Sequence, residues 1–317
     1  MATELTSTVP AGTLPYSNLL APSFFLMAVQ DTLSLYGHPA LVDLRGIAQQ
    51  LNAPKGQTLA STITVQIEAP ASAWSSTNEG TAVAADTSID PTYATISVGN
   101  YDLAHGVSDE LRRRDSTGQF NWPAIVRSMV TGWQLTFTGL VVALANSMTN
   151  TVGSTGNPIT LDLIRDARDS VEVNGKSLAA GNFVAVLAPQ QWNMLRADIQ
   201  DRGGAIERRA DYDAMQRAGL SNYKGSYDGI DYWTSDQTPE SSGDYSGCMF
   251  ASGAIGHLVL EQAEATASQV RIFDAGILTL EEARDASAKT TRLIGAATIG
   301  VSILRQEIAC KILSIGS

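Results

Sequence analysis

The order of three segments constrains this fold more than any motif in the chain. Two β-patterned segments, Thr58–Glu68 and Tyr93–Leu103, enclose a long polar stretch. An apolar helix pattern follows at Trp122–Met148, and the chain ends on the β-patterned stretch Thr298–Ile312. The first two segments predict a projecting hairpin, because each alternates apolar and polar residues as a half-buried strand does. A two-stranded hairpin is marginal by itself in water, so we expect it to lean on a neighbouring subunit.

The segment Trp122–Met148 predicts a single long helix that is covered on several sides. Its apolar residues recur every three or four positions, which aligns them on one face. Asn121 can cap this helix, and Pro123 suits its first turn because proline has no backbone N–H to donate there. The apolar positions are Met129, Trp133, Phe137, Leu140, Leu144 and Met148, with Val130, Val141 and Val142 widening the face.

The same stretch raises the alternative of a protein that crosses a membrane once. Residues 128–161 carry no charge, and a spanning helix needs about 20 mainly apolar residues. The best window, Met129–Met148, contains Thr131, Gln134 and other polar side chains that are unfavourable in lipid. A buried helix is therefore the preferred interpretation.

Charge and cysteine content argue against several functional classes. The net charge of −11 disfavours a protein whose main task is to grip nucleic acid, since phosphate binding needs clustered Lys and Arg. Cys248 and Cys310 are too few for a disulfide framework and lack metal-ligand spacing. We predict two small apolar residues in a reducing compartment. No Lys or Arg precedes Arg45, so no secretory signal is expected.

Residues 159–262 have the pattern of an α/β module. Two helix patterns, Leu161–Val171 and Pro189–Ile199, flank the buried strand pattern Phe183–Leu187. The Gly-, Arg- and Tyr-rich stretch Arg202–Gly229 predicts a loop region. Further strands are predicted at Ile230–Thr234, Cys248–Ser252, Leu258–Leu260, Gln269–Phe273, Ile277–Glu281, Thr298–Ile303 and Ile308–Leu313.

Weaker patterns complete the expectations for secondary structure. Ser23–Leu35 predicts a short helix, and Leu41–Leu51 predicts a further helical turn or two. The alternation slips at Gly99-Asn100, which indicates a β-bulge.

No pattern in the sequence combines the residues that catalysis or cofactor binding needs. Ser170–Ser177 resembles a phosphate-binding loop but lacks its first glycine and follows a helix pattern, so we predict a polar turn. His38, His105 and His257 lie apart in the chain, without an HExxH motif. We predict no catalytic residue, no cofactor and no metal site, with a hydrolase of unrecognised site as the alternative.

The order of arm, hairpin, long helix, α/β module and closing strands resembles the major capsid proteins of tailed double-stranded DNA bacteriophages, whose fold encapsulins share. The resemblance runs from about Leu41 to the end of the chain. It includes the strand–helix stretch Phe183–Trp192 and the closing segment Gly300–Ile312. It implies an α+β fold of the phage major-capsid type, with an N-terminal arm, an extended β-hairpin loop, a long spine helix, and peripheral and axial domains.

The resemblance divides the chain into five parts. Residues 1–57 correspond to the N-terminal arm with short helices, and residues 58–105 to the extended β-hairpin loop. Residues 106–157 correspond to the peripheral domain with its spine helix, and residues 158–262 to the axial domain. Residues 263–317 correspond to the closing β-strands of the peripheral domain.

The resemblance implies a structural protein, not an enzyme. Such a protein self-assembles through hexamers and pentamers into an icosahedral shell that encloses the phage double-stranded DNA without sequence-specific binding. The implied partners are other copies of the chain, a separate scaffolding protein, a portal and decoration proteins, with no membrane. The implied location is the virion capsid, after assembly in the cytoplasm of the host bacterium. An encapsulin-like nanocompartment shell is the nearest alternative.

The candidate inter-subunit contacts lie in the hairpin tip and in two arginine-rich stretches. Acidic neighbours such as Asp201, Glu207 and Asp211 balance the second of these stretches, so ion pairs between subunits fit it at least as well as phosphate contacts. The candidates are Trp74, Glu79, Asp86, Arg112, Arg113, Arg114, Arg202, Arg208 and Arg209.

Overall fold

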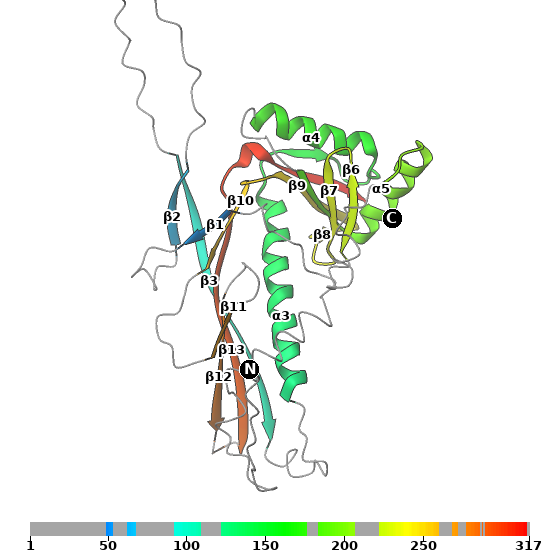
Figure 1. Ribbon diagram of the computed structural model, residues 1–317. Helices are drawn as coiled ribbons and strands as arrows, with labels where there is room; N and C mark the ends of the chain where they lie inside the picture. Colours follow the sequence, from blue (N-terminus) through cyan, green and yellow to red (C-terminus); the bar gives the residue numbers. More distant parts are fainter. Residues whose placement is uncertain are drawn as a thin grey trace, which may run out of the picture.

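A long sheet runs beside one helix, and an α/β module lies at one end of that helix (Figure 1). The computed structural model describes residues 49–52, 62–67, 92–108, 122–175, 183–206, 222–259, 268–271, 277–285, 287 and 289–315. The helix is α3, Trp122–Ala143, and it is extended by the 3-10 turn η2, Leu144–Ser147.

Strand β13 organises the long sheet, because it pairs with three other strands. The sheet has the order β1 (Gln49–Asn52), β10 (Ile255–Val259), β13 (Thr290–Ile303), β12 (Ile277–Asp285) and β11 (Ser268–Arg271). Strand β3 (Thr92–Ser108) also pairs with β13, and β2 (Thr62–Ile67) pairs with β3. All of these pairings are antiparallel except that of β1 with β10.

The α/β module contains the second sheet and two helices. Its strands have the order β4 (Thr151–Gly153), β14 (Ala309–Ile315), β9 (Asp244–Ala251), β5 (Phe183–Leu187), β7 (Ile230–Thr234) and β6 (Tyr223–Tyr227), with β8 (Glu240–Ser241) beside β9. The helices are α4 (Leu161–Gly175) and α5 (Pro189–Asp201). Every residue of β5 is buried, which explains its continuous apolar sequence.

Helix α3 contributes its apolar stripe to one continuous core with both sheets. Met129, Phe137 and Met148 are buried as predicted, and Trp133 stacks on Phe137 with ring centroids 5.8 Å apart. Leu140 and Leu144 are only partly buried. The α-helix ends at Ala143 rather than at Met148, and Met148 has extended backbone. The side chain of Gln306 caps the 3-10 turn that follows the helix, because its Nε2 donates to the Ser147 carbonyl oxygen at 3.1 Å.

Two chain crossings join the sheets at one place. The chain passes from β9 to β10 through residues 252–254, and from β13 to β14 through the 3-10 turn η5, Gln306–Ile308. The backbone N–H of Leu304 donates to the Ala254 carbonyl oxygen at 2.8 Å, which ties the crossings together. Asn150 Nδ2 donates to the carbonyl oxygens of Gln306 and Ala309 at 2.9 and 3.1 Å. The end of α3 is therefore held at the same junction.

The predicted pairing of the two β-patterned arms is confirmed, but the predicted bulge is wrong. Strands β2 and β3 pair from Thr62 opposite Ser97 to Ile67 opposite Thr92. Beyond Ser97, β3 pairs with β13 without interruption, from Val98 opposite Gly300 to Ser108 opposite Thr290. Because β3 changes partner at this point, its pattern of burial changes there. The slip in alternation reflects that change rather than an inserted residue.

Three other predictions are corrected by the structure. Residues 49–51 belong to strand β1 and not to a helical turn. Residues 170–175 continue helix α4 instead of forming a polar turn, since Arg168 and Glu172 form an ion pair of 2.7 Å at helical spacing. The expected loop Arg202–Gly229 contains strand β6, which pairs with β7. The predicted helix Ser23–Leu35 lies outside the described residues.

The remaining strand predictions of the module and of the closing segments are confirmed within a few residues. Helix α5 begins at Pro189 as predicted, and β7 matches Ile230–Thr234 at both ends. Strands β9 to β14 each overlap a predicted strand, with β13 beginning at Thr290 rather than at Thr298.

Candidate assembly surfaces

The β2–β3 ribbon projects from the long sheet (Figure 1). Those of its described side chains that are exposed are mostly polar or aromatic. Thr62, Thr64 and Tyr93 are exposed, and Tyr93 exposes 59% of its surface. Among the described strands, β2 pairs only with β3, so its outer edge has no strand partner there. Such an edge can accept a strand from another chain.

The base of the ribbon is fixed where β13 passes it. Ile96 is fully buried, and a Cβ atom added to Gly300 would lie 2.8 Å from the Ile96 Cγ2 atom. The Ser302 hydroxyl donates to the Thr95 carbonyl oxygen at 3.2 Å. The base of the ribbon is therefore fixed to the sheet at Ile96 and Thr95.

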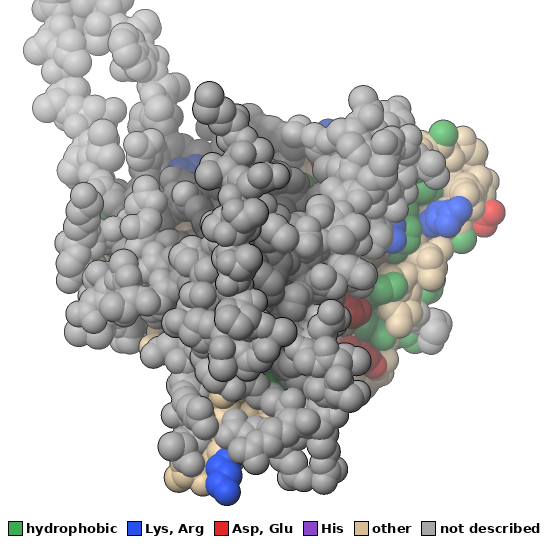
Figure 2. All heavy atoms as spheres, turned by 60° about the horizontal axis from the view of Figure 1, so that its bottom comes forward, with side chains coloured by type: hydrophobic (Ala, Val, Ile, Leu, Met, Phe, Trp, Pro, Cys, Tyr) green, Lys and Arg blue, Asp and Glu red, His purple; other side chains and the backbone are tan. Residues whose placement is uncertain are grey.

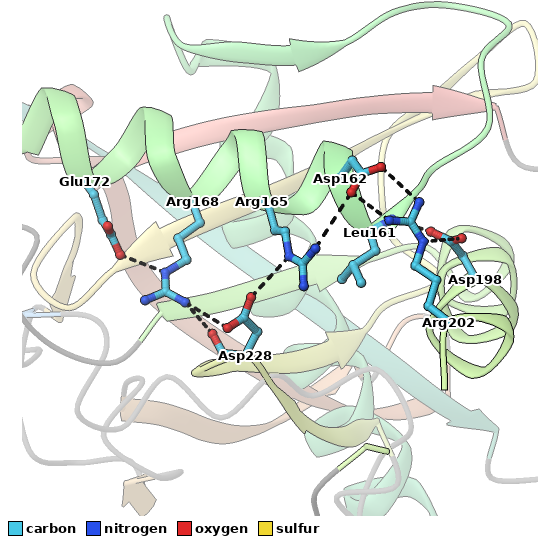
Figure 3. A network of polar contacts seen from close by, with 8 residues as sticks. All are labelled: Leu161, Asp162, Arg165, Arg168, Glu172, Asp198, Arg202 and Asp228. Atoms are coloured by element: carbon cyan, nitrogen blue, oxygen red, sulfur yellow. Dashed lines mark hydrogen bonds and ion pairs between the residues drawn. The ribbon is translucent and has the colours of Figure 1, made fainter. Parts of the chain in front are cut away.

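A row of ionic contacts joins α4 to α5 and to the β6–β7 turn, and we call it the α4 network (Figure 3). It consists of Asp162, Arg165, Arg168, Glu172, Asp198, Arg202 and Asp228. Thr160 caps α4, since its hydroxyl accepts from the Leu163 N–H at 3.3 Å. The free N–H of Leu161 donates to Asp198 Oδ2 of α5 at 2.6 Å. The first turn of α4 is thus attached to α5.

Arg202 closes one end of this network. Its Nη1 and Nη2 atoms donate to the two carboxylate oxygens of Asp162 at 2.7 and 2.9 Å, and its Nε donates to Asp198 Oδ1 at 3.0 Å. The hydrogen bond from Arg202 lowers the pKa of Asp162 below its ordinary value. The same bonds raise the pKa of Arg202, so both groups stay charged at neutral pH.

Arg165 and Arg168 lie at the other end and converge on the β6–β7 turn (Figure 3). Arg168 Nη1 donates to the Asp228 carbonyl oxygen at 2.6 Å, and Arg165 Nε lies 3.5 Å from Asp228 Oδ2. The guanidinium of Arg168 also lies over the ring of Phe183, 5.3 Å from its centroid. Asp228 and Gly229 both have positive φ, which is the geometry of a two-residue hairpin turn.

Of the nine candidate contact residues, the structure describes only Arg202. Its ion-pair partners in the structure belong to its own chain, and its side chain remains 40% exposed. A further contact with a neighbouring subunit stays a prediction. The other eight candidates, Trp74, Glu79, Asp86, Arg112, Arg113, Arg114, Arg208 and Arg209, lie outside the described residues.

A cleft between α5 and the β6–β7 hairpin was not predicted from the sequence. Its volume is about 660 Å³, and Arg196, Lys224 and Asp236 supply its charged side chains. These residues are scattered in the chain, so no local cluster marked them. The Asp228-Gly229 pair was the available signal, because Asp-Gly between two strands predicts the hairpin that forms one wall.

The described residues do not assemble a recognisable reaction centre. None of their His, Cys, Asp and Glu side chains gather in a group of three or more that could hold a metal ion. Cys248 and Cys310 are buried free thiols, as predicted. Burial raises the pKa of Cys248 to about 12 and that of Cys310 to about 11, so both are unreactive at neutral pH.

The face shown in Figure 2 has no single large patch of one charge among its described side chains. On the side of the α/β module, Lys and Arg lie beside acidic and hydrophobic side chains (Figure 2). Such mixing suits contacts with protein more than a continuous grip on phosphates. Of the helices that the structure describes, none combines the length and the apolar character needed to cross a membrane.

Comparisons with known proteins find similarity in structure and not in sequence. No family model matches the chain, and no curated protein matches it. The capsid of Ralstonia phage GP4 is similar with a TM-score of 0.65 at 10% identity, covering 100% of this chain and 99% of that chain. The capsid of cyanophage P-SCSP1u has a TM-score of 0.58 at 14% identity, covering 99% and 94% of the two chains. The SrpI encapsulin complex of Synechococcus elongatus has a TM-score of 0.56 at 12% identity, covering 85% of each.

Proposed function

We propose that this chain, which has the α+β fold of phage capsid proteins, is the shell-forming major capsid protein of a tailed bacteriophage. The observation that carries the proposal is the likeness to the Ralstonia phage GP4 capsid over the full length of both chains. The likeness to the capsid of cyanophage P-SCSP1u supports the same structural, non-enzymatic role.

The proposed shell forms by contacts between copies. Residues 58–105 act as the extended loop that reaches a neighbour, and the long helix α3 acts as the spine of a peripheral domain. Residues 158–262 act as the axial domain that meets its copies in hexamers and pentamers. The exposed edge of β2 supports this assignment, because main-chain hydrogen bonds to a neighbouring copy would stabilise an otherwise marginal ribbon. Many such weak contacts add up through multivalency.

The proposed content of the shell is double-stranded DNA, and the proposed partners are a scaffolding protein, a portal and decoration proteins. The net charge of −11 supports enclosure without adhesion, since an acidic protein holds DNA only weakly. The shell would assemble in the host bacterial cytoplasm and persist in the virion.

An encapsulin-like nanocompartment is the second candidate, because the SrpI encapsulin has the same fold. Negative-stain electron microscopy of the expressed chain, alone and with its genomic neighbours, tests both candidates. We expect closed icosahedral shells or capsomer rings. Monomers under all conditions would contradict both functions, and shells that carry a protein cargo but never DNA would favour the nanocompartment.

A further inference from the structure

The cleft between α5 and the β6–β7 hairpin has the size of a binding site. Its volume of about 660 Å³ lies within the range of roughly 300–1,000 Å³ that is typical of ligand sites. One wall is a single face of α5, since Trp192, Arg196 and Gln200 follow each other at intervals of one helical turn. The opposite wall is formed by Asn222, Lys224, Thr234 and Asp236.

Among the described residues that line the cleft, basic side chains outnumber acidic ones, which is opposite to the balance of the whole chain. Arg196 and Lys224 face one carboxylate, Asp236, in a protein with 32 acidic and 21 basic residues. Arg196 is exposed and forms no ion pair with the other described residues. Partial burial removes water from the ammonium group of Lys224, which lowers its pKa. Lys224 already has an interaction within its own chain, so Arg196 is the cation that lacks an ion-pair partner among the described residues. A carboxylate brought into the cleft would pair with Arg196 and would also be attracted by the charge of Lys224.

A buried donor in the wall also lacks an acceptor. Asn222 is only 6% exposed, and its Nδ2 atom has no hydrogen-bond partner in the described structure. Buried polar groups of native proteins normally have a partner, because an unmet donor is costly. The chain itself closes this atom off from solvent, so an acceptor oxygen from outside reaches it only where the wall of the cleft opens locally.

We propose that this cleft binds an Asp- or Glu-bearing segment of a second copy of this chain. The inference rests on the proposed shell function, which places many copies of an acidic chain in contact. Asp236 argues against a polyanion such as DNA, because it would repel successive phosphates, whereas a single carboxylate can pair with Arg196 in a cleft that Lys224 also lines. The amide side chains of Asn193 and Gln200 are suited to the backbone of an extended segment.

Zero-length crosslinking of assembled particles tests this inference, because Lys224 is the only lysine among the described residues that line the cleft. Particles assembled from an equal mixture of 14N- and 15N-labelled chains are treated with a carbodiimide, which joins amines to carboxylates in contact. Mass spectrometry should find Lys224 joined to Asp or Glu in peptide pairs of mixed isotope composition. Lys224→Gln should remove these pairs, whereas Lys289→Gln, at an exposed lysine outside the cleft, should leave them unchanged.

Assembly itself gives a second readout. The double variant Arg196→Gln/Lys224→Gln should raise the protein concentration needed for assembly about tenfold, with an unchanged circular dichroism spectrum, while Lys289→Gln should not.

Intact particles whose Lys224 forms only pairs within one chain, or none, would overturn the inference while the proposed function stands. Equal assembly of the double variant would do the same. Lys224 that becomes reactive to acetylation only after nuclease treatment would identify DNA as the occupant. Wild-type protein that never assembles would refute the proposed function and this occupant together.

Discussion

Arg202 and Asp162 form a bidentate pair in which two parallel N–H groups meet two carboxylate oxygens, at 2.7 and 2.9 Å (Figure 3). Arg202 also holds Asp198, whose other oxygen accepts the N–H of Leu161. One side chain at the end of α5 therefore fixes the first turn of α4. The helix gains both an acceptor for a free N–H and a carboxylate, Asp162, near its positive end.

The stability that this pair contributes should depend on acid pH. The folded-state pKa of Asp162 lies below its ordinary value of 3.8. A lowered pKa contributes stability that is fully present above the unfolded-state pKa of about 3.9 and is lost as the pH falls through the folded value. Asp162→Asn should thus be less stable than wild type at pH 7, with the difference shrinking toward pH 3. Guanidinium unfolding at both pH values measures this difference, which should be small because the pair is exposed.

The exposed Asp166 on the same helix provides the control. Asp166→Asn should leave the free energy of unfolding at pH 7 nearly unchanged. An Asp162→Asn variant that loses as much stability at pH 3 as at pH 7 would contradict the assigned role of the pair.

Gln191 should be far more sensitive to substitution than its neighbour Gln190. It is fully buried, its Oε1 accepts the Ala188 N–H at 3.0 Å, and its Nε2 donates to the Tyr245 carbonyl oxygen and to the Ser314 hydroxyl. Gln191→Leu leaves these groups without their partner, and each unmet group costs about 1–3 kcal/mol. Since three groups lose their partner, we expect a loss of about 3–5 kcal/mol in the free energy of unfolding.

Chemical denaturation measures this loss, and Gln190→Leu is the matched control because Gln190 is exposed. The control should change stability by less than about 0.5 kcal/mol. Equal effects of the two substitutions would show that the buried hydrogen bonds do not hold β14 against α5.

Gly153 should not tolerate a side chain, because the last residues of β14 approach its backbone. It has a φ of +91°, and a Cβ atom there would collide with the carbonyl oxygen of Leu313, which is backbone and cannot turn away. Gly156 also has positive φ, at +77°, but nothing lies within 4 Å of its Cβ position. Gly156→Ala should therefore cost only the left-handed backbone penalty of about 1–2 kcal/mol.

Gly153→Ala adds the collision to that penalty. Overpacking lowers the free energy of unfolding by a further ~1–3 kcal/mol. Thermal and chemical unfolding of the two variants should rank wild type above Gly156→Ala and Gly156→Ala above Gly153→Ala. Equal stability of the two variants would argue against a close approach of β14 to β4.

The success of sequence reasoning depended on where a segment finds its partners. Strand β5 and helix α5 were predicted because a continuous apolar run and a proline in the first turn are local signals. The partner change of β3 at Ser97 has no local signal, so it was mistaken for a bulge. The polar residues 170–175 remain helical because Arg168 and Glu172 pair on the helix surface.

Less of the candidate site than of the fold could be predicted, because its residues find their partners far away in the sequence. The local run of arginines predicts Arg202 as a contact residue, but it does not show the partners of Arg202. These are Asp162, in the first turn of α4, and Asp198, one turn earlier in α5. The cleft residues Arg196 and Lys224 are far apart in sequence, and they line the same cleft because β6 pairs with β7 beside α5. Sequence spacing cannot show such meetings.

The two cysteines should resist alkylation in the folded protein and should not form a disulfide. Cys310 lies opposite Met249 in the β14–β9 ladder, while Cys248 lies opposite Lys311. Successive residues of a strand point to opposite faces, so the two thiols lie on different sides of the sheet. With pKa values raised to about 12 and about 11, few thiolates exist at pH 8.

Iodoacetamide labelling followed by mass spectrometry tests this prediction. Labelling of the folded protein at pH 8 should be roughly a hundredfold slower than in denaturant, because the thiolate is the reacting species. One rapidly labelled cysteine, or a disulfide in the native protein, would contradict the burial of these thiols.

Removal of the hairpin tip should separate folding from assembly. Residues 71–91 lie beyond the described part of the ribbon, whereas its base is held by the buried Ile96 and by the contact between Ser302 and Thr95. Deletion of Ala71–Pro91 should therefore leave a folded chain, with a circular dichroism spectrum and a melting temperature close to those of wild type. Assembly should fail or need a much higher protein concentration, as measured by light scattering and electron microscopy.

A chain with a scrambled tip of the same length and composition is the control. It distinguishes a requirement for the length of the tip from a requirement for particular side chains such as Trp74. Normal shells from the deleted chain would show that the ribbon does not join neighbouring copies, and an unfolded chain would show that the tip serves the fold instead.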